Sequence, residues 1–157
     1  MSIQNPSKGS IVFKLIIVLL IGVLIYVLYE PYVIFEQEIY YKAESRLRME
    51  NIRVAQLKFI SDPKGVGKYN NSLDSLILYI KAGLESGTLK KEEFKPLTSG
   101  TFVPESLART PKSWVPYMLA TVDTAVIKKY VLECPDGYGT IGSLTEEEKL
   151  NKADWEN

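Results

Sequence analysis

An apolar run near the N-terminus constrains this chain more than any other feature. The segment KLIIVLLIGVLIYVLYEPY extends from Lys14 to Tyr32, and after Lys14 it carries no charge until Glu30. Counted from Ile11, the apolar stretch ends at Tyr29 after about 19 residues, which would span about 28 Å as a helix. That length matches the roughly 30 Å hydrocarbon core of a bilayer.

Three explanations fit an apolar run of this kind: a cleaved signal peptide, a buried core helix or a retained membrane anchor. The apolar part of a signal peptide is shorter, about 7–15 residues, and ends in a cleavage site made of small residues. This run ends in the bulky sequence YVLYEPY, and a core helix of such uniformity needs a much larger protein around it. We therefore predict a transmembrane helix over residues 11–29 that stays on the protein.

The charges on either side of the run predict its orientation. Lys8 and Lys14 lie at its N-terminal end, and no acidic residue occurs before Glu30. Acidic residues follow the span, and the first basic residue on that side is Lys42. Because lysine and arginine favour the cytoplasmic side of a span, we expect residues 1–10 in the cytoplasm. The C-terminal domain would then lie in the periplasm, attached to the inner membrane by a single span.

The composition narrows the chemistry available to the rest of the chain. The sequence has 19 basic and 19 acidic residues, no histidine and a single cysteine, Cys134. The balanced charge gives no sign of the basic face that binds nucleic acid. The absence of histidine removes the most common general base and metal ligand. We therefore expect no enzymatic activity, no cofactor, no bound metal and no nucleic-acid partner.

Residues 30–60 are predicted to form a stalk helix that continues from the span. The sequence from Phe35 to Asp62 has no Gly or Pro and is rich in helix-forming residues. We expect its first half to be solvated and its second half, with a stripe of Ile52, Ala55 and Phe59, to pack onto a domain core. The alternative is a short coiled coil between copies of the chain, because apolar residues recur at heptad spacing. The candidate interaction residues of that stripe are Tyr40, Leu47 and Val54.

Residues 61–143 are predicted to form a small exported α+β domain. Glycines and a proline in the sequence SDPKGVGKYNN end the stalk helix. The segment after Asn71 has the apolar period of a short amphipathic helix, with Leu73, Leu76, Ile77, Ile80 and Leu84 on its buried face. We expect the ring of Tyr69 to lie over the junction between the stalk and this helix, with its hydroxyl in water. Tyr69 is thus a core residue or, alternatively, a binding contact.

The C-terminal half of the chain predicts an antiparallel hairpin or small sheet. Residues 86–114 are polar, contain three prolines and predict a long loop with a short helical turn. The sequences PYMLATV and TAVIKKYVLECP have strand character, and the second is expected to place Val126, Tyr130, Leu132 and Cys134 on one face. The Asp-Gly pair in PDGYG predicts a turn into a short third strand.

The end of the chain, residues 144–157, is predicted to be an acidic tail. It is either a short helix with a capping box of Thr145 and Glu148 or frayed. Of the two tryptophans, Trp114 is expected in the core because it lies near Pro116. Trp155 is the candidate interface residue, since tryptophan is enriched among residues that anchor partners.

The order of these features resembles that of pilins and pseudopilins. Those proteins commonly carry an Ala-Gln pair, an aromatic residue, a Gly-Lys-Tyr loop and a Ser-Leu pair after their long helix. The matching residues here are Ala55, Gln56, Phe59, Gly67, Lys68, Tyr69, Ser72, Leu73 and Leu76. The resemblance is closer still to a group of uncharacterised single-span proteins of Bacteroidota, which share the Glu30-Pro31 pair. It covers roughly residues 11–82.

One departure from the pilin pattern matters for assembly. Most prepilins are cut after a glycine and carry a glutamate five residues further on, which is thought to meet the N-terminal amine of a neighbour. Here Gly9 is present, but Lys14 stands where that glutamate would be. Because a lysine would repel the amine, neither cleavage at Gly9 nor filament assembly by that route is expected.

These features together predict a non-enzymatic component of a cell-envelope assembly that is anchored in the inner membrane. Its expected partners are the lipid bilayer, other envelope proteins and further copies of itself as a homo-oligomer. The alternative is a membrane-tethered periplasmic binding module for a small ligand or cell-wall fragment, which would require a pocket lined by tyrosines.

Overall fold

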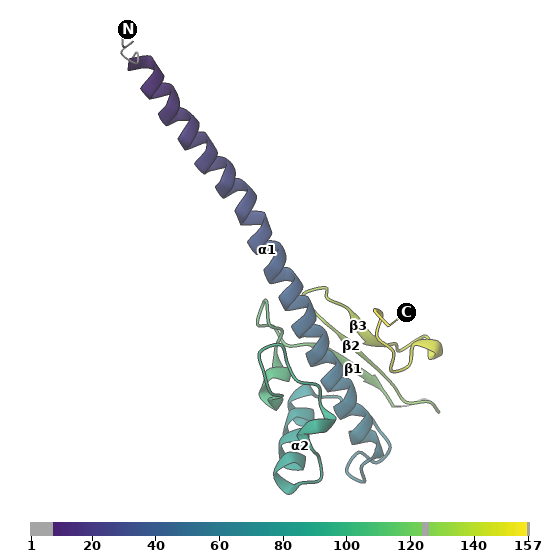
Figure 1. The fold of residues 1–157 in the computed structure, drawn as a ribbon. Coiled ribbons are helices and arrows are strands. Elements are labelled where there is room, and N and C mark those ends of the chain that lie inside the picture. The colour runs from purple at the N-terminus through teal and green to yellow at the C-terminus, as the bar shows by residue number, and fades with distance from the viewer. Residues whose placement is uncertain (1–7, 124–125, 157) are drawn as a thin grey trace. The chain divides into compact units, whose positions relative to one another are not determined.

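A computed structural model describes residues 8–123 and 126–156. The chain divides into two compact units, residues 1–39 and residues 40–157. The described residues form two α-helices, short 3-10 helices and one small sheet, which confirms the predicted α+β class. Figure 1 shows their arrangement within the chain. The elements are α1 Lys8–Ser61, α2 Leu73–Ser86, η1 Lys91–Glu93, η2 Pro104–Ala108, β1 Met118–Val122, β2 Lys129–Glu133, β3 Thr140–Gly142 and η3 Glu147–Lys149.

The first unit holds the N-terminal part of α1, whose apolar side chains are left uncovered. Every large apolar residue from Ile11 to Tyr29 is between 42% and 67% exposed. In the part of the chain that the structure describes, α1 is the one helix long and apolar enough to cross a membrane. A single N-terminal helix of this kind is consistent with single-pass anchoring, as predicted.

The second unit is built around the C-terminal part of α1 and the amphipathic helix α2. On α1, Ile52 and Ala55 are fully buried, so the predicted packing of this half of the helix onto a core is confirmed. α2 buries Leu76, Ile77 and Ile80, as its apolar period predicts. Its ends have ordinary caps: the hydroxyl of Ser72 accepts a hydrogen bond from the Ser75 amide, and Gly87 closes the helix in the left-handed conformation.

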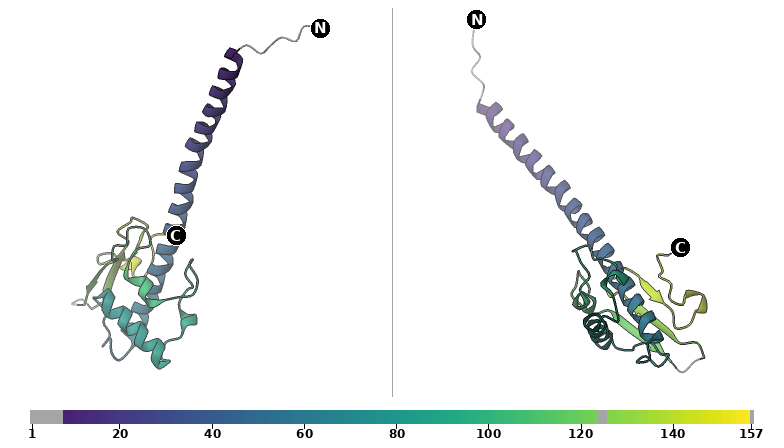
Figure 2. Two further views of the ribbon diagram at one scale, coloured as in Figure 1. Left: turned by 90° about the vertical axis from the view of Figure 1, so that its left-hand side faces the viewer. Right: turned by 60° about the horizontal axis from the view of Figure 1, so that its bottom comes forward.

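The sheet has the strand order β1-β2-β3 with antiparallel pairing throughout. Tyr130 and Leu132 of β2 and Ile141 of β3 are buried on one face, and Figure 2 shows the sheet beside the C-terminal part of α1. The predicted face of the second strand is correct for Tyr130, Leu132 and Cys134. It is wrong for Val126, which is fully exposed because β2 begins only at Lys129.

The C-terminal segment covers the outer edge of β3. The amide of Gly142 donates to the Lys152 carbonyl at 2.9 Å, and the amide of Asp154 donates to the Thr140 carbonyl at 3.0 Å. The capping box predicted for Thr145 is not formed, since η3 has no side-chain cap. Instead the Ser143 hydroxyl accepts hydrogen bonds from the two amides that precede η3.

The prediction that Trp114 belongs to the core is wrong. Its side chain is 66% exposed and its φ angle is +60°. The chain reverses direction here, because the amide of Thr110 donates to the Val115 carbonyl at 2.8 Å. Tyr117, three residues later, occupies the core position instead.

Gly142, the last residue of β3, has no room for a side chain. Its φ angle is +82°, and a Cβ atom would lie 2.3 Å from the Tyr130 carbonyl oxygen. We expect Gly142→Ala to lower the free energy of unfolding by about 3 kcal/mol, from backbone strain and the clash together. Gly87 is the matched control, because its φ angle is +73° but nothing lies within 4 Å, so Gly87→Ala should cost about 1 kcal/mol. Chemical unfolding of the full chain in detergent measures both, and equal losses would contradict the packing described.

Candidate functional site

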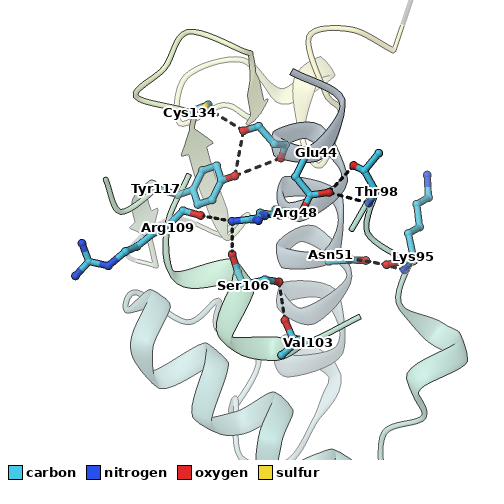
Figure 3. Close-up of polar contacts among 11 residues, drawn as sticks. Glu44, Arg48, Asn51, Lys95, Thr98, Val103, Ser106, Arg109, Tyr117 and Cys134 are labelled. Carbon is cyan, nitrogen blue, oxygen red and sulfur yellow. Dashed lines mark hydrogen bonds and ion pairs between the residues drawn. The ribbon is translucent and has the colours of Figure 1, made fainter. Parts of the chain in front are cut away.

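The buried side of α1 carries polar side chains as well as apolar ones. Glu44, Ser45, Asn51 and Gln56 are all fully buried. The connection between α2 and β1 has no strand and only two short 3-10 helices, so its backbone N–H and C=O groups need other partners. Figure 3 shows the polar side chains of α1 reaching these segments on both sides of the helix.

Glu44 and Arg48 form an ion pair that ties two parts of the connection to α1. The Arg48 Nε donates to Glu44 Oε1 at 2.9 Å, and the other Glu44 oxygen accepts from the Thr98 amide at 2.7 Å. Arg48 also donates to the backbone carbonyls of Ser106 at 3.0 Å and Arg109 at 2.8 Å. Both Glu44 oxygens accept hydrogen bonds, and Arg48 donates from Nε and Nη1. Each charge therefore has a counter-charge and further hydrogen bonds, which is what a buried ion pair requires.

Two side-chain amides each bind both backbone groups of one residue. The Asn51 amide donates to the Lys95 carbonyl at 2.9 Å and accepts from the Lys95 amide at 2.7 Å. Gln56 makes the same pair of bonds to Asn70, at 2.8 and 2.9 Å. Each clamp imitates the two bonds of a strand pairing, in segments where no strand is present.

A third contact joins α1 to the sheet. The Ser45 hydroxyl lies 3.0 Å from the Tyr117 hydroxyl and 3.2 Å from the Cys134 sulfur. Burial raises the pKa of the Tyr117 hydroxyl above its usual value, and the bond to Ser45 only partly opposes this effect. The tyrosine therefore stays neutral, and the three groups satisfy one another inside the core.

Tyr69 lies against the sheet. Its ring centroid is 4.7 Å from that of Tyr130 on β2, and its hydroxyl pairs with the Asn151 side chain at 3.3 Å. Tyr69 packs against the core, so its interpretation as a core residue is confirmed. Its hydroxyl, which was expected in water, pairs with Asn151 instead. The contact to Asn151 links the Gly-Lys-Tyr loop to the C-terminal segment.

Trp155 packs onto Gly139 and under an arginine. The Arg46 guanidinium lies 4.7 Å from the centre of its ring. A Cβ atom at Gly139 would meet that ring at 2.5 Å. Trp155 is half-buried, and a partner would therefore reach only part of its ring.

The three heptad residues of α1 have different surroundings. Tyr40 is 42% exposed, whereas Leu47 is half-buried and Val54 packs against the core cluster. The structure therefore does not bring Tyr40, Leu47 and Val54 together as one open stripe. Their role in contacts between copies of the chain stays a prediction.

The C-terminal segment is also tied to α1 by an ion pair. Arg53 donates to both Glu156 oxygens at 2.7 and 2.8 Å and to the Asn151 carbonyl at 3.1 Å. The hydrogen bonds from Arg53 lower the pKa of Glu156 to about 2. The acidic end of the chain is thus attached to the helix at two points.

A polar hollow of about 460 Å³ lies between the Gly-Lys-Tyr loop and the end of β1. It is bordered by Gly65, Lys68, Asn71, Thr121 and Asp123, among others. One tyrosine, Tyr69, takes part in its lining, and the ring of that tyrosine is already packed on Tyr130. The hollow therefore differs from the tyrosine-lined pocket that the small-ligand alternative requires.

The residues that sequence reasoning missed are the buried polar ones of α1 and the exposed apolar ones around β1. Met118 is 51% exposed at the start of β1, and Trp114 and Val115 precede it in solvent. The signal for the buried residues was present in part, because Gln56 belongs to the Ala-Gln pair of the resemblance. Nothing in their spacing distinguishes Glu44 or Asn51 from solvated helix residues.

Comparisons with known proteins give no match for this chain. No protein family matches the chain, and no curated protein or solved structure is similar to it. Among residues 8–123 and 126–156, no three His, Cys, Asp or Glu side chains come together to hold a metal ion.

The buried ion pair of Glu44 and Arg48 should contribute more to the free energy of unfolding than an exposed ion pair does. Arg48→Met leaves the Glu44 carboxylate buried without its counter-charge, and we expect a loss of about 3–5 kcal/mol in the free energy of unfolding. Lys81→Met removes the exposed pair with Glu105 and should cost less than about 1 kcal/mol. Chemical unfolding in detergent measures the free energy of unfolding of both variants. A similar small loss in both variants would show that the buried pair does not hold the connection in place.

Proposed function

We propose that this chain is a single-pass membrane protein that acts, without catalysis, as a structural or interaction component of a cell-envelope assembly. The observation that carries the proposal is the uncovered apolar run from Ile11 to Tyr29. Soluble monomers rarely expose contiguous apolar patches above a few hundred Å². A run of this length needs a bilayer around it, and its length matches the hydrocarbon core.

The charges that flank the run support an orientation with the N-terminus in the cytoplasm. Lys8 and Lys14 are at the N-terminal end, while Glu30 and further acidic residues follow the span. On this proposal the second unit works in the periplasm, on the outer face of the inner membrane.

The buried polar side chains of the second unit bind the chain's own backbone, which supports a role through protein contacts. Glu44, Arg48, Asn51 and Gln56 are all engaged in holding backbone segments against α1. Several apolar side chains remain exposed near the sheet, and Trp114 and Met118 are the largest of these. A long N-terminal helix whose C-terminal part packs on a small antiparallel sheet also supports the proposed pilin-like relationship.

Capture of a small ligand is less well supported. The hollow beside β1 has a polar lining, and Tyr69, the tyrosine in that lining, already contacts the sheet. We therefore favour partners that are proteins.

The anchor is tested by placing charges within it. We expect the full-length chain to stay in membranes through an alkaline carbonate wash, and protease added to spheroplasts to remove its C-terminal part. Leu20→Arg combined with Leu24→Arg should release the chain, because each arginine near the bilayer centre costs about 3 kcal/mol.

The matched control places the same two charges on the exported domain. Leu78 and Val103 are exposed there, so Leu78→Arg with Val103→Arg should leave membrane retention unchanged. Release of the unaltered chain by carbonate, or protection of its C-terminal part in spheroplasts, would contradict the proposed function.

A further inference from the structure

The face of the sheet that points away from the core is apolar. Tyr130 and Leu132 of β2 are buried in the core, so Val131 between them points to the opposite face, because side chains alternate along a strand. The register gives the β1 residues that share this face: Met118, Ala120 and Val122. We call these three residues and Val131 the outer face. An antiparallel sheet with one face in water normally alternates apolar and polar residues, whereas β1 presents no polar residue on this side.

The side chains of the outer face stay outside the core. In the part of the chain that the structure describes, neither the core cluster nor the residues packed against it include any of them. Met118 is 51% exposed, Ala120 is exposed, and Val122 and Val131 are half-buried. Exposed apolar surface on a sheet marks a site of interaction.

The strands run lengthwise beside the C-terminal part of α1, as Figures 1 and 2 show. Ser45 of α1 bonds to Cys134, directly after β2. Burial raises the pKa of Tyr130, near the other end of β2, and the nearby charge of Arg53 partly opposes this rise. The two intervals agree in length, because the eight helical residues span about 12 Å and the four strand residues about 13 Å.

Two copies anchored in one membrane need their α1 helices to run in the same direction. A two-fold axis keeps that direction only when it runs along the helices, and the strands lie along the same line. Two sheets can pack face to face about such an axis, with their strands aligned and about 10 Å between the sheets. We propose that two copies of this chain associate through the outer face in this way, with β1 of each copy over β2 of the other. Ala120 of each copy then faces Val131 of the other.

The charges at the ends of the strands favour a second copy as the occupant. Lys129 begins β2, level with the end of β1, where exposed Asp123 follows. Glu133 ends β2, level with the start of β1. Near that start, exposed Arg109 donates to the Trp114 carbonyl at 2.9 Å. With β1 of each copy over β2 of the other, acidic and basic groups lie near each other at both ends, which is the self-complementarity that a two-fold interface requires.

Two of these charges already have partners within the chain. Asp123 pairs with Lys68 at 2.9 Å, and Lys129 lies 3.5 Å from Glu147. Both pairs include an exposed partner, and such pairs contribute little to stability, so a second copy can share them. Glu133 is exposed and forms no ion pair among residues 8–123 and 126–156.

The outer face is too small to hold two freely diffusing proteins together. Strands of five residues are about 17 Å long and three strands are about 14 Å across, so the flat face covers roughly 240 Å² per copy. Stable complexes bury about 800 Å² per partner. Anchoring in one membrane raises the effective concentration of copies, so the inference rests on the proposed function, which supplies that anchoring.

Cysteine crosslinking of the full-length chain in its membranes tests the inference. On a Cys134→Ser background, Ala120→Cys should give a band of twice the chain mass with a bis-maleimide whose spacer is about 10 Å, the distance between packed sheets. Leu78→Cys is the matched control, because Leu78 is exposed but belongs to α2 and lies outside the sheet. Its band should be about ten-fold weaker, since the spacer matches only the distance between packed sheets.

A charge on the outer face should disrupt the association. Met118→Glu, added to Ala120→Cys, places a carboxylate level with Glu133 of the other copy. Because like charges at an interface repel each other, the band should fall to the level of the Leu78→Cys control. Leu78→Glu on the same background adds an acid away from the sheet, and should leave the band unchanged.

The following results would overturn the inference. Equal crosslinking of Ala120→Cys and Leu78→Cys would show that the outer faces do not meet. A band that Met118→Glu leaves unchanged, or that Leu78→Glu reduces equally, would show the same. An adduct of any other mass would show that a different protein covers the outer face. Absence of the dimer in a chain that resists carbonate extraction removes only this inference, whereas carbonate release removes the proposed function.

Discussion

Hydrogen bonds from buried side chains of α1 to the backbone of neighbouring loops are the interactions on which the second unit depends. Its core is small, and about thirty residues between α2 and β1 include no strand and little helix. Buried backbone groups without partners cost about 1–3 kcal/mol each. Glu44, Arg48 and Asn51 supply partners to this segment, and Gln56 does so for the loop between α1 and α2. All four come from a single helix, which also provides the apolar wall of the core.

Because the buried polar side chains of α1 bind backbone groups, we assign them a structural role. The function is inferred instead from apolar side chains that are exposed. The Glu44 carboxylate and the side-chain amides of α1 are bound to backbone groups at 2.7–2.9 Å. The longest apolar feature left uncovered in the described residues is the run from Ile11 to Tyr29. The proposal of a bilayer around this run follows from the rule that exposed apolar surface of this extent needs a partner.

The sequence predicts those parts of the fold that have a period or a turn signal. The long N-terminal helix follows from an uninterrupted apolar run, α2 from its helical period, and the sheet from strand-like runs around an Asp-Gly pair. The Asn51 clamp was not predictable, because Asn51 has the spacing of an ordinary helix surface residue, and Gln56 was indicated only by the Ala-Gln pair of the resemblance. Trp114 was misplaced because a tryptophan near a proline suggests burial, whereas the turn that exposes it depends on a hydrogen bond between Thr110 and Val115. Tertiary hydrogen bonds of this kind have no local pattern in the amino-acid sequence.

Amide hydrogen exchange of the full-length protein in detergent tests the central claim most directly. The amides of Asn70, Lys95 and Thr98 lie in loops, yet each donates to a buried side chain of α1. If these bonds hold the unit together, the three amides exchange as slowly as those of the β2 ladder, through global unfolding. Exchange at the rate of an unstructured peptide would show that the loops are held by something else.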